Sequence, residues 1–169
     1  VEAAEYLADN GVWVIRMGTL MKDRFPTHHP KIIDYAFSTT KKDLLDIWLF
    51  ASCYFCISTS TGPDIISNVY KRPMLFVNAS PLGHLNSWSD SIWVPKRVIW
   101  EKSGNHLNLR EMLQHNYFRT EEYTNAGIRM IDLSPKEIFE AVDERVMRSK
   151  GTWTDNEEDI IFQKRFWEQ

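Results

Sequence analysis

Residues 56–78 read C-I-S-T-S-T-G-P-D-I-I-S-N-V-Y-K-R-P-M-L-F-V-N, and this stretch decides the fold. It begins with a short apolar run, passes through a polar turn at 59–62, and continues into a helical segment that Pro73 ends. A second apolar run, 74–78, follows at once. A strand, a helix and a strand joined by such short links predict a right-handed crossover between two parallel strands.

The same alternation extends to both sides of this stretch. We expect strands over residues 12–17, 32–37, 91–94 and, at the edge of the sheet, 128–133. We expect helices over residues 2–10, from Thr40 to about 53, 108–114, 134–149, and from Thr154 to the end. The helix after Thr40 is apolar nearly all round, so we expect it to be buried. The pattern predicts an α/β fold with a doubly wound, Rossmann-like parallel sheet.

Composition argues against several classes of function. The 169 residues carry a formal net charge of −3, and acidic and basic residues are mixed, so we expect no nucleic-acid partner. No apolar run approaches the ~20 residues that a membrane-spanning helix requires, and no basic-then-apolar leader is present, so we expect a cytoplasmic protein. Cys53 and Cys56 have C-x-x-C spacing, but they lie where a helix ends and a strand begins. We therefore interpret them as core thiols rather than a redox pair or zinc ligands.

The turn after the first strand of this stretch carries the strongest chemical signal. Ligands of open α/β sheets bind outside the carboxyl ends of the strands, and a helix N-terminus favours phosphate. The turn offers adjacent hydroxyls, and its glycine lets the backbone approach a ligand. We predict that a phosphate group is bound here by Ser58, Thr59, Ser60, Thr61, Gly62 and Asp64. The alternative is that the hydroxyls only cap the helix and that Asp64 only complements its dipole.

Three residues outside the turn are further candidates. Arg16 lies near the end of an apolar strand, where a guanidinium can pair with a diphosphate in a fork geometry. A structural ion pair with Asp34 accounts for Arg16 equally well. Asn78 ends a strand, and His84 lies in the loop that follows it, so we predict donor contacts for both. For His84 the alternative is a role in folding the loop.

The stretch 56–78 also resembles the strand, turn, helix and strand of GT-B glycosyltransferase C-terminal domains, in which a glycine-containing turn holds the phosphates of the donor. Heptosyltransferases are similar at Thr61, Gly62 and Pro63. Ser60 stands where they carry an acid and Ile65 where they carry a histidine. Their details of donor recognition therefore do not carry over to this chain.

More closely, the chain resembles a family of bacterial glycosyltransferases associated with surface-polysaccharide genes. The shared features are G-V-W-V-I-R-M-G (11–18), H-P-K-I-I-D-Y-A (29–36), S-T-S-T-G (58–62), P-L-G-H-L (81–85) and G-T-W (151–153). This resemblance covers nearly the whole chain. It implies that residues 1–150 are the nucleotide-sugar-binding half of a GT-B enzyme. It also implies that a helix in 151–169 returns toward an N-terminal domain outside this sequence.

The activity that the resemblance implies is sugar transfer from a nucleotide-activated donor to a glycan or lipid-linked glycan acceptor, in surface polysaccharide or lipopolysaccharide synthesis. It implies no metal and no cofactor, and the sequence contains no D-x-D motif. The catalytic residues stay unassigned, and we expect this half alone to be inactive. Contact with the inner face of the membrane would come from the missing part. Two other interpretations stay open: a sugar-nucleotide 2-epimerase and a non-catalytic nucleotide-binding module.

Overall fold

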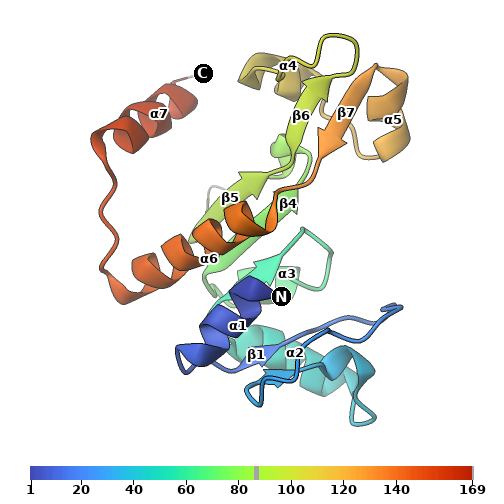
Figure 1. The fold of residues 1–169 in the computed structure, drawn as a ribbon, viewed down its shortest axis with the longest axis vertical. Coiled ribbons are helices and arrows are strands. Elements are labelled where there is room, and N and C mark those ends of the chain that lie inside the picture. Colours follow the sequence, from blue (N-terminus) through green and yellow to red (C-terminus); the bar gives the residue numbers. More distant parts are fainter. Residues whose placement is uncertain (86–87, 169) are drawn as a thin grey trace.

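The computed structural model describes residues 1–85 and 88–168. Its described strands form three small sheets (Figure 1). The first pairs β1 (Val14–Ile15) with β2 (Ile32–Ile33) in parallel. The second is parallel throughout and contains β3 (Cys56–Ser58), β4 (Met74–Ala79) and β5 (Ser91–Pro95), with β4 in the middle. The third pairs β6 (Arg97–Trp100) with β7 (Ile128–Ile131) in antiparallel fashion.

The central sheet confirms the α/β prediction. β3 and β4 are parallel neighbours, with Cys56 opposite Met74, and the short helix α3 (Ile65–Val69) connects them. β4 is buried over its length except at Asn78, as expected for a strand covered on both faces. The described strands are mostly parallel and alternate with helices, an arrangement compatible with a Rossmann-like fold.

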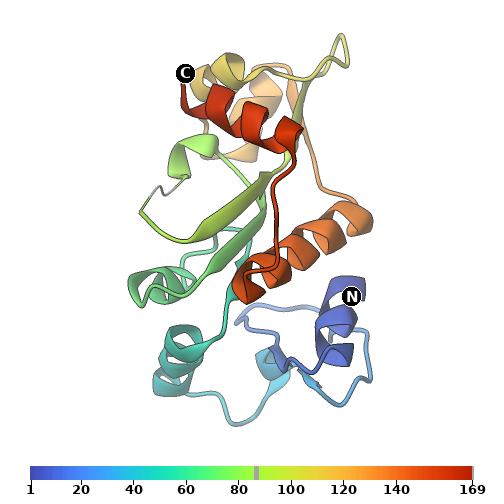
Figure 2. The same cartoon turned by 90° about the vertical axis from the view of Figure 1, so that its left-hand side faces the viewer.

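The core lies on both faces of β4, because successive side chains of a strand point to opposite sides. Leu75 and Val77 pack with residues of α1 (Glu2–Asp9) and α6 (Pro135–Lys150). Met74 and Phe76 pack on the other face, where Phe50 of α2 (Asp43–Ser52) and Trp93 of β5 contribute. Figure 2 shows α6 and α1 on one side of the central sheet and α2 and α3 on the other.

Several helix ends follow from local sequence. Ser134 and Glu137 form a reciprocal capping box at the start of α6, and Gly151 ends that helix with φ 70°. Asn108 caps α4 (Leu109–Gln114) in the same way. The structure adds a short helix, α5 (Thr120–Asn125), that we did not predict. It also adds the 3₁₀ turns η1 (Tyr35–Phe37) and η2 (Leu82–His84).

The prediction that all strands belong to a single sheet is wrong, because the described strands form three sheets. β1 and β2 form their own pair, and the expected strand 32–37 shortens to Ile32–Ile33 because η1 follows it. The expected edge strand over 128–133 pairs with β6, which we did not predict, and not with the parallel sheet. Strand pairing depends on contacts between distant segments, and apolar runs do not reveal which run is the neighbour.

α2 is less buried than predicted, and α3 buries its polar side. No residue of α2 is buried, Leu44 is 78% exposed and Trp48 is 60% exposed. The helix begins after Lys42 without a side-chain cap, so Thr40 is not its cap. α3 exposes the apolar Ile65 and buries Ser67, whose hydroxyl donates to the Phe50 carbonyl at 2.8 Å. This hydrogen bond satisfies the hydroxyl group that α3 buries at Ser67.

The last helix, α7 (Glu157–Trp167), stands apart from the layers in Figure 1. Asn156 and Asp159 form its capping box, and Thr154 has no part in it. Ile160, Phe162 and Trp167 are each more than half exposed. Among the described helices, none has the length and apolar character needed to cross a membrane.

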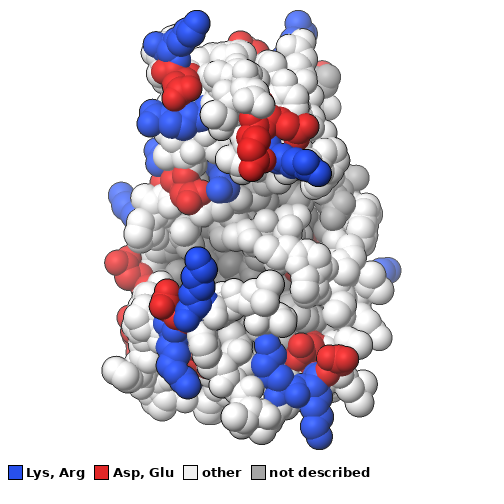
Figure 3. Space-filling model, turned by 90° about the vertical axis from the view of Figure 1, so that its right-hand side faces the viewer, with Lys and Arg blue, Asp and Glu red and all other residues white. Residues whose placement is uncertain are grey.

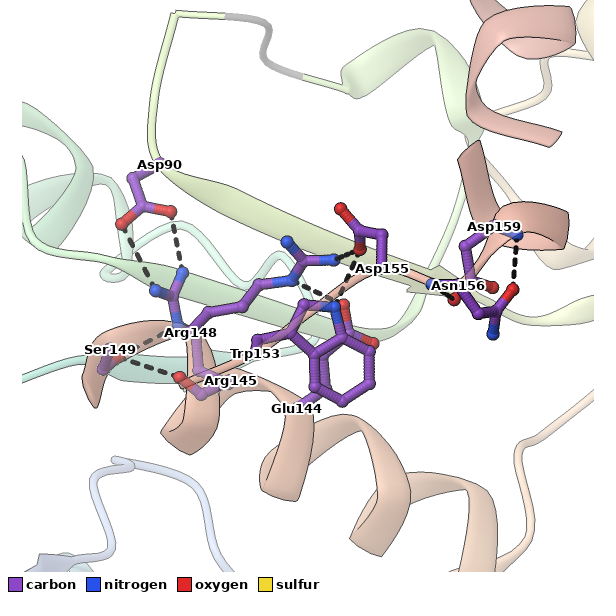
Figure 4. Close-up of polar contacts among 9 residues, drawn as sticks. All are labelled: Asp90, Glu144, Arg145, Arg148, Ser149, Trp153, Asp155, Asn156 and Asp159. Atoms are coloured by element: carbon purple, nitrogen blue, oxygen red, sulfur yellow. Dashed lines mark hydrogen bonds and ion pairs between the residues drawn. The ribbon is translucent and has the colours of Figure 1, made fainter. Parts of the chain in front are cut away.

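The segment between α6 and α7 is held against α6 by charge (Figure 4). Arg148 forms ion pairs with Glu144 of its own helix, at 2.7 Å, and with Asp155 of the connecting segment, at 2.5 Å. Trp153 lies against the Arg148 guanidinium and donates its indole N–H to Asp155 at 2.7 Å. This indole N–H, together with the Arg148 guanidinium, holds the pKa of Asp155 below its ordinary value. These contacts set the direction in which the chain leaves α6.

Candidate functional site at the carboxyl edge of the parallel sheet

A hollow of about 360 Å³ lies at the carboxyl ends of the three parallel strands. Figure 3 looks onto the right-hand side of Figure 1 and shows the surface hollowed between its upper and lower parts. The strand ends contribute Thr59 after β3, Asn78 and Ser80 at the end of β4, and Lys96 after β5. The facing wall contains Tyr117, Phe118, Thr120, Tyr123, Met130 and Asp132. This edge is where open α/β sheets bind their ligands.

Asn78 joins the central sheet to the facing wall. It lies at an irregularity between β4 and β5 and has a positive φ of 54°, which is uncommon outside glycine. Its side-chain oxygen accepts a hydrogen bond of 2.7 Å from the Leu133 backbone N–H. That bond places the end of β7, and therefore Asp132, beside the end of β4.

Lys96 and Asp132 form the ion pair of the hollow, with 2.7 Å between Nζ and Oδ1. The pairing of β6 with β7 explains it, because Arg97 lies opposite Ile131 and the next residues outward are Lys96 and Asp132. The Lys96 side chain is 30% exposed and the Asp132 side chain 68% exposed. Among the residues that line the hollow, Lys96 and Asp132 are the charged ones, so the lining carries no net charge.

Aromatic side chains form much of the facing wall. Tyr123 is buried, and the Tyr117 ring meets it edge-on with the ring centroids 5.2 Å apart. Phe118 is 75% exposed, and the His84 ring lies against it at 4.9 Å. His84 therefore reaches the rim of the hollow through Phe118, although it does not line the hollow itself.

The turn 59–62 is organised from within by Asp64. This carboxylate is buried and accepts hydrogen bonds from the Ser58 hydroxyl at 2.5 Å and from the Thr61 backbone N–H at 3.2 Å. The Ser60 N–H donates to the Ser58 oxygen at 3.1 Å, and Gly62 has a φ of 67°. Ser58 and Asp64 thus shape the turn. One backbone N–H of the turn, that of Thr61, already donates to the Asp64 carboxylate and is not free to bind a ligand.

The remaining hydroxyls of the turn are open to solvent. Thr59, Ser60 and Thr61 are exposed, and no described residue bonds to their hydroxyl groups. Thr59 is the member of the turn that lines the hollow. The predicted phosphate contact stays a prediction, with these three hydroxyls as its donors.

Arg16 is placed in a different part of the molecule from the hollow. Its Nη1 lies 3.4 Å from the Asp34 carboxylate and donates to the Asp23 carbonyl at 3.0 Å. The guanidinium also lies over the Phe25 ring at 5.5 Å. β1 pairs with β2 alone. The carboxyl end of β1, which Arg16 follows, is therefore not part of the sheet edge formed by β3, β4 and β5. The geometry favours the structural ion pair over diphosphate binding.

Sequence reasoning missed most of the facing wall. Lys96 reads as a solvated charge, and Asp132 follows a short apolar run without any motif. Their proximity depends on the pairing of β6 with β7, which joins segments about thirty residues apart. The adjacent aromatic residues Tyr117 and Phe118, which lie between α4 and α5, were a signal that the sequence offered.

Neither thiol chemistry nor a metal centre emerges from the described residues. Both cysteines are free, and burial raises the pKa of the Cys56 thiol to about 12, which suits a core side chain and not a nucleophile. The described His, Cys, Asp and Glu side chains form no group of three or more that could hold a metal ion.

Comparisons of the chain with protein-family models, curated proteins and solved structures found no match.

Proposed function

We propose that this chain is the donor-binding half of a GT-B glycosyltransferase, which transfers a sugar from a nucleotide-activated donor to a glycan or lipid-linked glycan acceptor. The observation that carries the proposal is the hollow at the carboxyl ends of β3, β4 and β5. Its volume of about 360 Å³ is in the range of small-molecule sites. A sugar fits its lining of hydroxyl groups, one amide and one ion pair.

The exposed hydroxyls of the turn supply the second part of the proposed site. Thr59 lines the hollow, and Ser60 and Thr61, the next two residues of the turn, are exposed. A donor whose sugar occupies the hollow would place its phosphates beside these hydroxyls, which donate hydrogen bonds to phosphate oxygens. His84 and Phe118 lie at the rim as aromatic surfaces for the rest of the donor. The proposed roles exclude Arg16, which is engaged by Asp34.

Isothermal titration of the chain with UDP-glucose, GDP-mannose, dTDP-glucose and CMP-sialic acid tests donor binding. We expect one of these donors to bind and Thr59→Val to weaken it about threefold to tenfold, the usual effect of losing one hydrogen bond. Thr39→Val is the matched control, because Thr39 is exposed and lies outside the hollow. If no donor binds, or if both variants weaken binding equally, the proposal fails.

The product of the reaction separates the remaining interpretations. Nucleotide released only when a glycan acceptor is present supports transfer. An isomerised nucleotide-sugar formed without acceptor supports a 2-epimerase instead. Binding without either product, also in any longer protein that contains this chain, supports a non-catalytic nucleotide-binding module.

A further inference from the structure

The charges in the hollow restrict which sugar it accepts. A phosphate or carboxylate site normally offers a cation without a counter-ion, because an anion binds such a group best. Here the lining cation, Lys96, already lies 2.7 Å from Asp132. A ligand carboxylate that approached Lys96 would also approach the Asp132 carboxylate, and the repulsion would offset the attraction. The hollow is therefore adapted to an uncharged ligand.

The ion pair still has free hydrogen-bonding capacity. Lys96 has three N–H donors and Asp132 two carboxylate oxygens, of which their mutual contact uses one each. No other described residue bonds to either side chain. A donor beside an acceptor, both charged, matches two adjacent hydroxyl groups, because each hydroxyl both donates and accepts.

The rest of the lining is consistent with a hydroxylated ring. Thr59 and Thr120 add two hydroxyl groups at different points of the wall, and the Ser80 hydroxyl lies 3.4 Å from the Tyr123 hydroxyl. Tyr117 and Phe118 add aromatic faces, against which the C–H face of a sugar ring packs. A planar nucleobase presents its donors and acceptors only along its edges, so it matches fewer of these dispersed polar groups than a hydroxylated ring does.

We propose that the Lys96–Asp132 pair binds adjacent hydroxyl groups of an uncharged pyranose and thereby excludes sugars that carry a carboxylate. This inference rests on the proposed function for the identity of the whole donor, since it concerns only the sugar subsite. Asn78 is a positioning residue for the subsite, because its bond to the Leu133 N–H holds the chain next to Asp132.

Saturation-transfer NMR with free glycosides tests the subsite without any nucleotide. The probes are the methyl glycosides of glucose, galactose and mannose and the methyl glycoside of glucuronic acid. We expect the wild-type chain to bind at least one neutral glycoside about tenfold more tightly than the glucuronoside. In Asp132→Asn the Lys96 charge is no longer balanced, so the preference should reverse toward the glucuronoside.

Two further variants control the experiment. Glu140→Gln also removes a carboxylate from a lysine ion pair, at 3.6 Å from Lys136 on α6, and should leave the preference unchanged. Lys96→Met should weaken the neutral glycosides without creating a preference for the acidic one. Far-ultraviolet circular dichroism confirms that the variants are folded.

The outcomes separate this inference from the proposed function. Equal binding of neutral and acidic glycosides by the wild type, no binding of any of them, or an unchanged preference in Asp132→Asn overturns the inference. Nucleotide-sugar binding that persists alongside such a result leaves the proposed function intact. Selective binding of neutral glycosides by a chain that binds no nucleotide-sugar supports the subsite and refutes the proposed function.

Discussion

The ion pair between Arg145 and Asp90 should be asymmetric in its effect on stability (Figure 4). The Arg145 side chain is 3% exposed, whereas that of Asp90 is 62% exposed. Two contacts join them, at 2.8 Å and 3.3 Å, and the Arg145 Nε also lies 3.3 Å from the Ser149 hydroxyl. Removing the carboxylate leaves a buried charge without its counter-ion, but removing the guanidinium leaves a carboxylate that water can reach.

The expected magnitudes follow from this difference in exposure. Removing one partner of a fully buried pair costs roughly 3–5 kcal/mol. Asp90 is mostly solvated and asparagine keeps one acceptor, so we expect Asp90→Asn to cost about 2 kcal/mol. Arg145→Met keeps much of the side-chain packing and removes the buried charge, so we expect a cost of about 1 kcal/mol or less.

Urea denaturation followed by circular dichroism measures both free energies of unfolding. For a chain of this size, 2 kcal/mol corresponds to a fall in Tm of about 4–8 °C, which gives a second reading. Glu140→Gln, at an exposed ion pair on the same helix as Arg145, should change stability by less than about 0.5 kcal/mol. If Arg145→Met destabilises the protein more than Asp90→Asn, the reasoning from buried charge is refuted.

Three further predictions concern other parts of the chain. Arg16→Lys should lower the free energy of unfolding by about 1 kcal/mol without changing donor affinity, because the guanidinium pairs with Asp34 and not with a ligand. A titration in which donor affinity falls while the free energy of unfolding is unchanged would contradict this. Hydrogen bonds from the Ser134 hydroxyl and backbone N–H hold the pKa of Glu137 below its ordinary value. The stabilisation that the Glu137 carboxylate provides is therefore present above its unfolded-state pKa and is lost as pH falls through its folded-state pKa. Glu137→Gln should therefore flatten the acid side of the stability curve, and parallel curves for variant and wild type would count against the capping-box explanation. Amides over residues 160–167 should exchange with solvent much faster than those of α6, because α7 leaves Ile160, Phe162 and Trp167 exposed; mass spectrometry that finds equal protection would show that α7 is held by the rest of the chain.

Local signals in the sequence were sufficient where neighbouring residues decide the outcome. The stretch 56–78 folds as the predicted strand, turn, helix and strand because its apolar runs act over a few residues, although α3 ends at Val69 and not at Pro73. The capping boxes at Ser134 and Asn108 formed for the same reason, since each joins residues three positions apart. The position of the hollow also followed, because parallel strands in succession bring their carboxyl ends to one edge.

The candidate site itself was only partly predictable. Thr59 and Asn78 line the hollow, His84 reaches its rim, and Ser58 and Asp64 shape the turn from within. Arg16 could not be assigned from sequence, because a strand-end arginine beside an acidic residue fits both an ion pair and a ligand. Lys96 and Asp132 became visible only through the antiparallel pairing of β6 with β7.

By itself, the sequence determined the α/β alternation, the crossover between β3 and β4, and the edge at which the carboxyl ends of these strands meet. Tertiary structure alone decided that the strands divide into three sheets, that α2 leaves an apolar face in solvent, and that Arg16 pairs with Asp34. The physical reason is the range of the interactions. Helix caps, turns and apolar periodicity act within a few residues, whereas sheet registers, ion pairs and burial depend on which distant segments meet when the chain collapses.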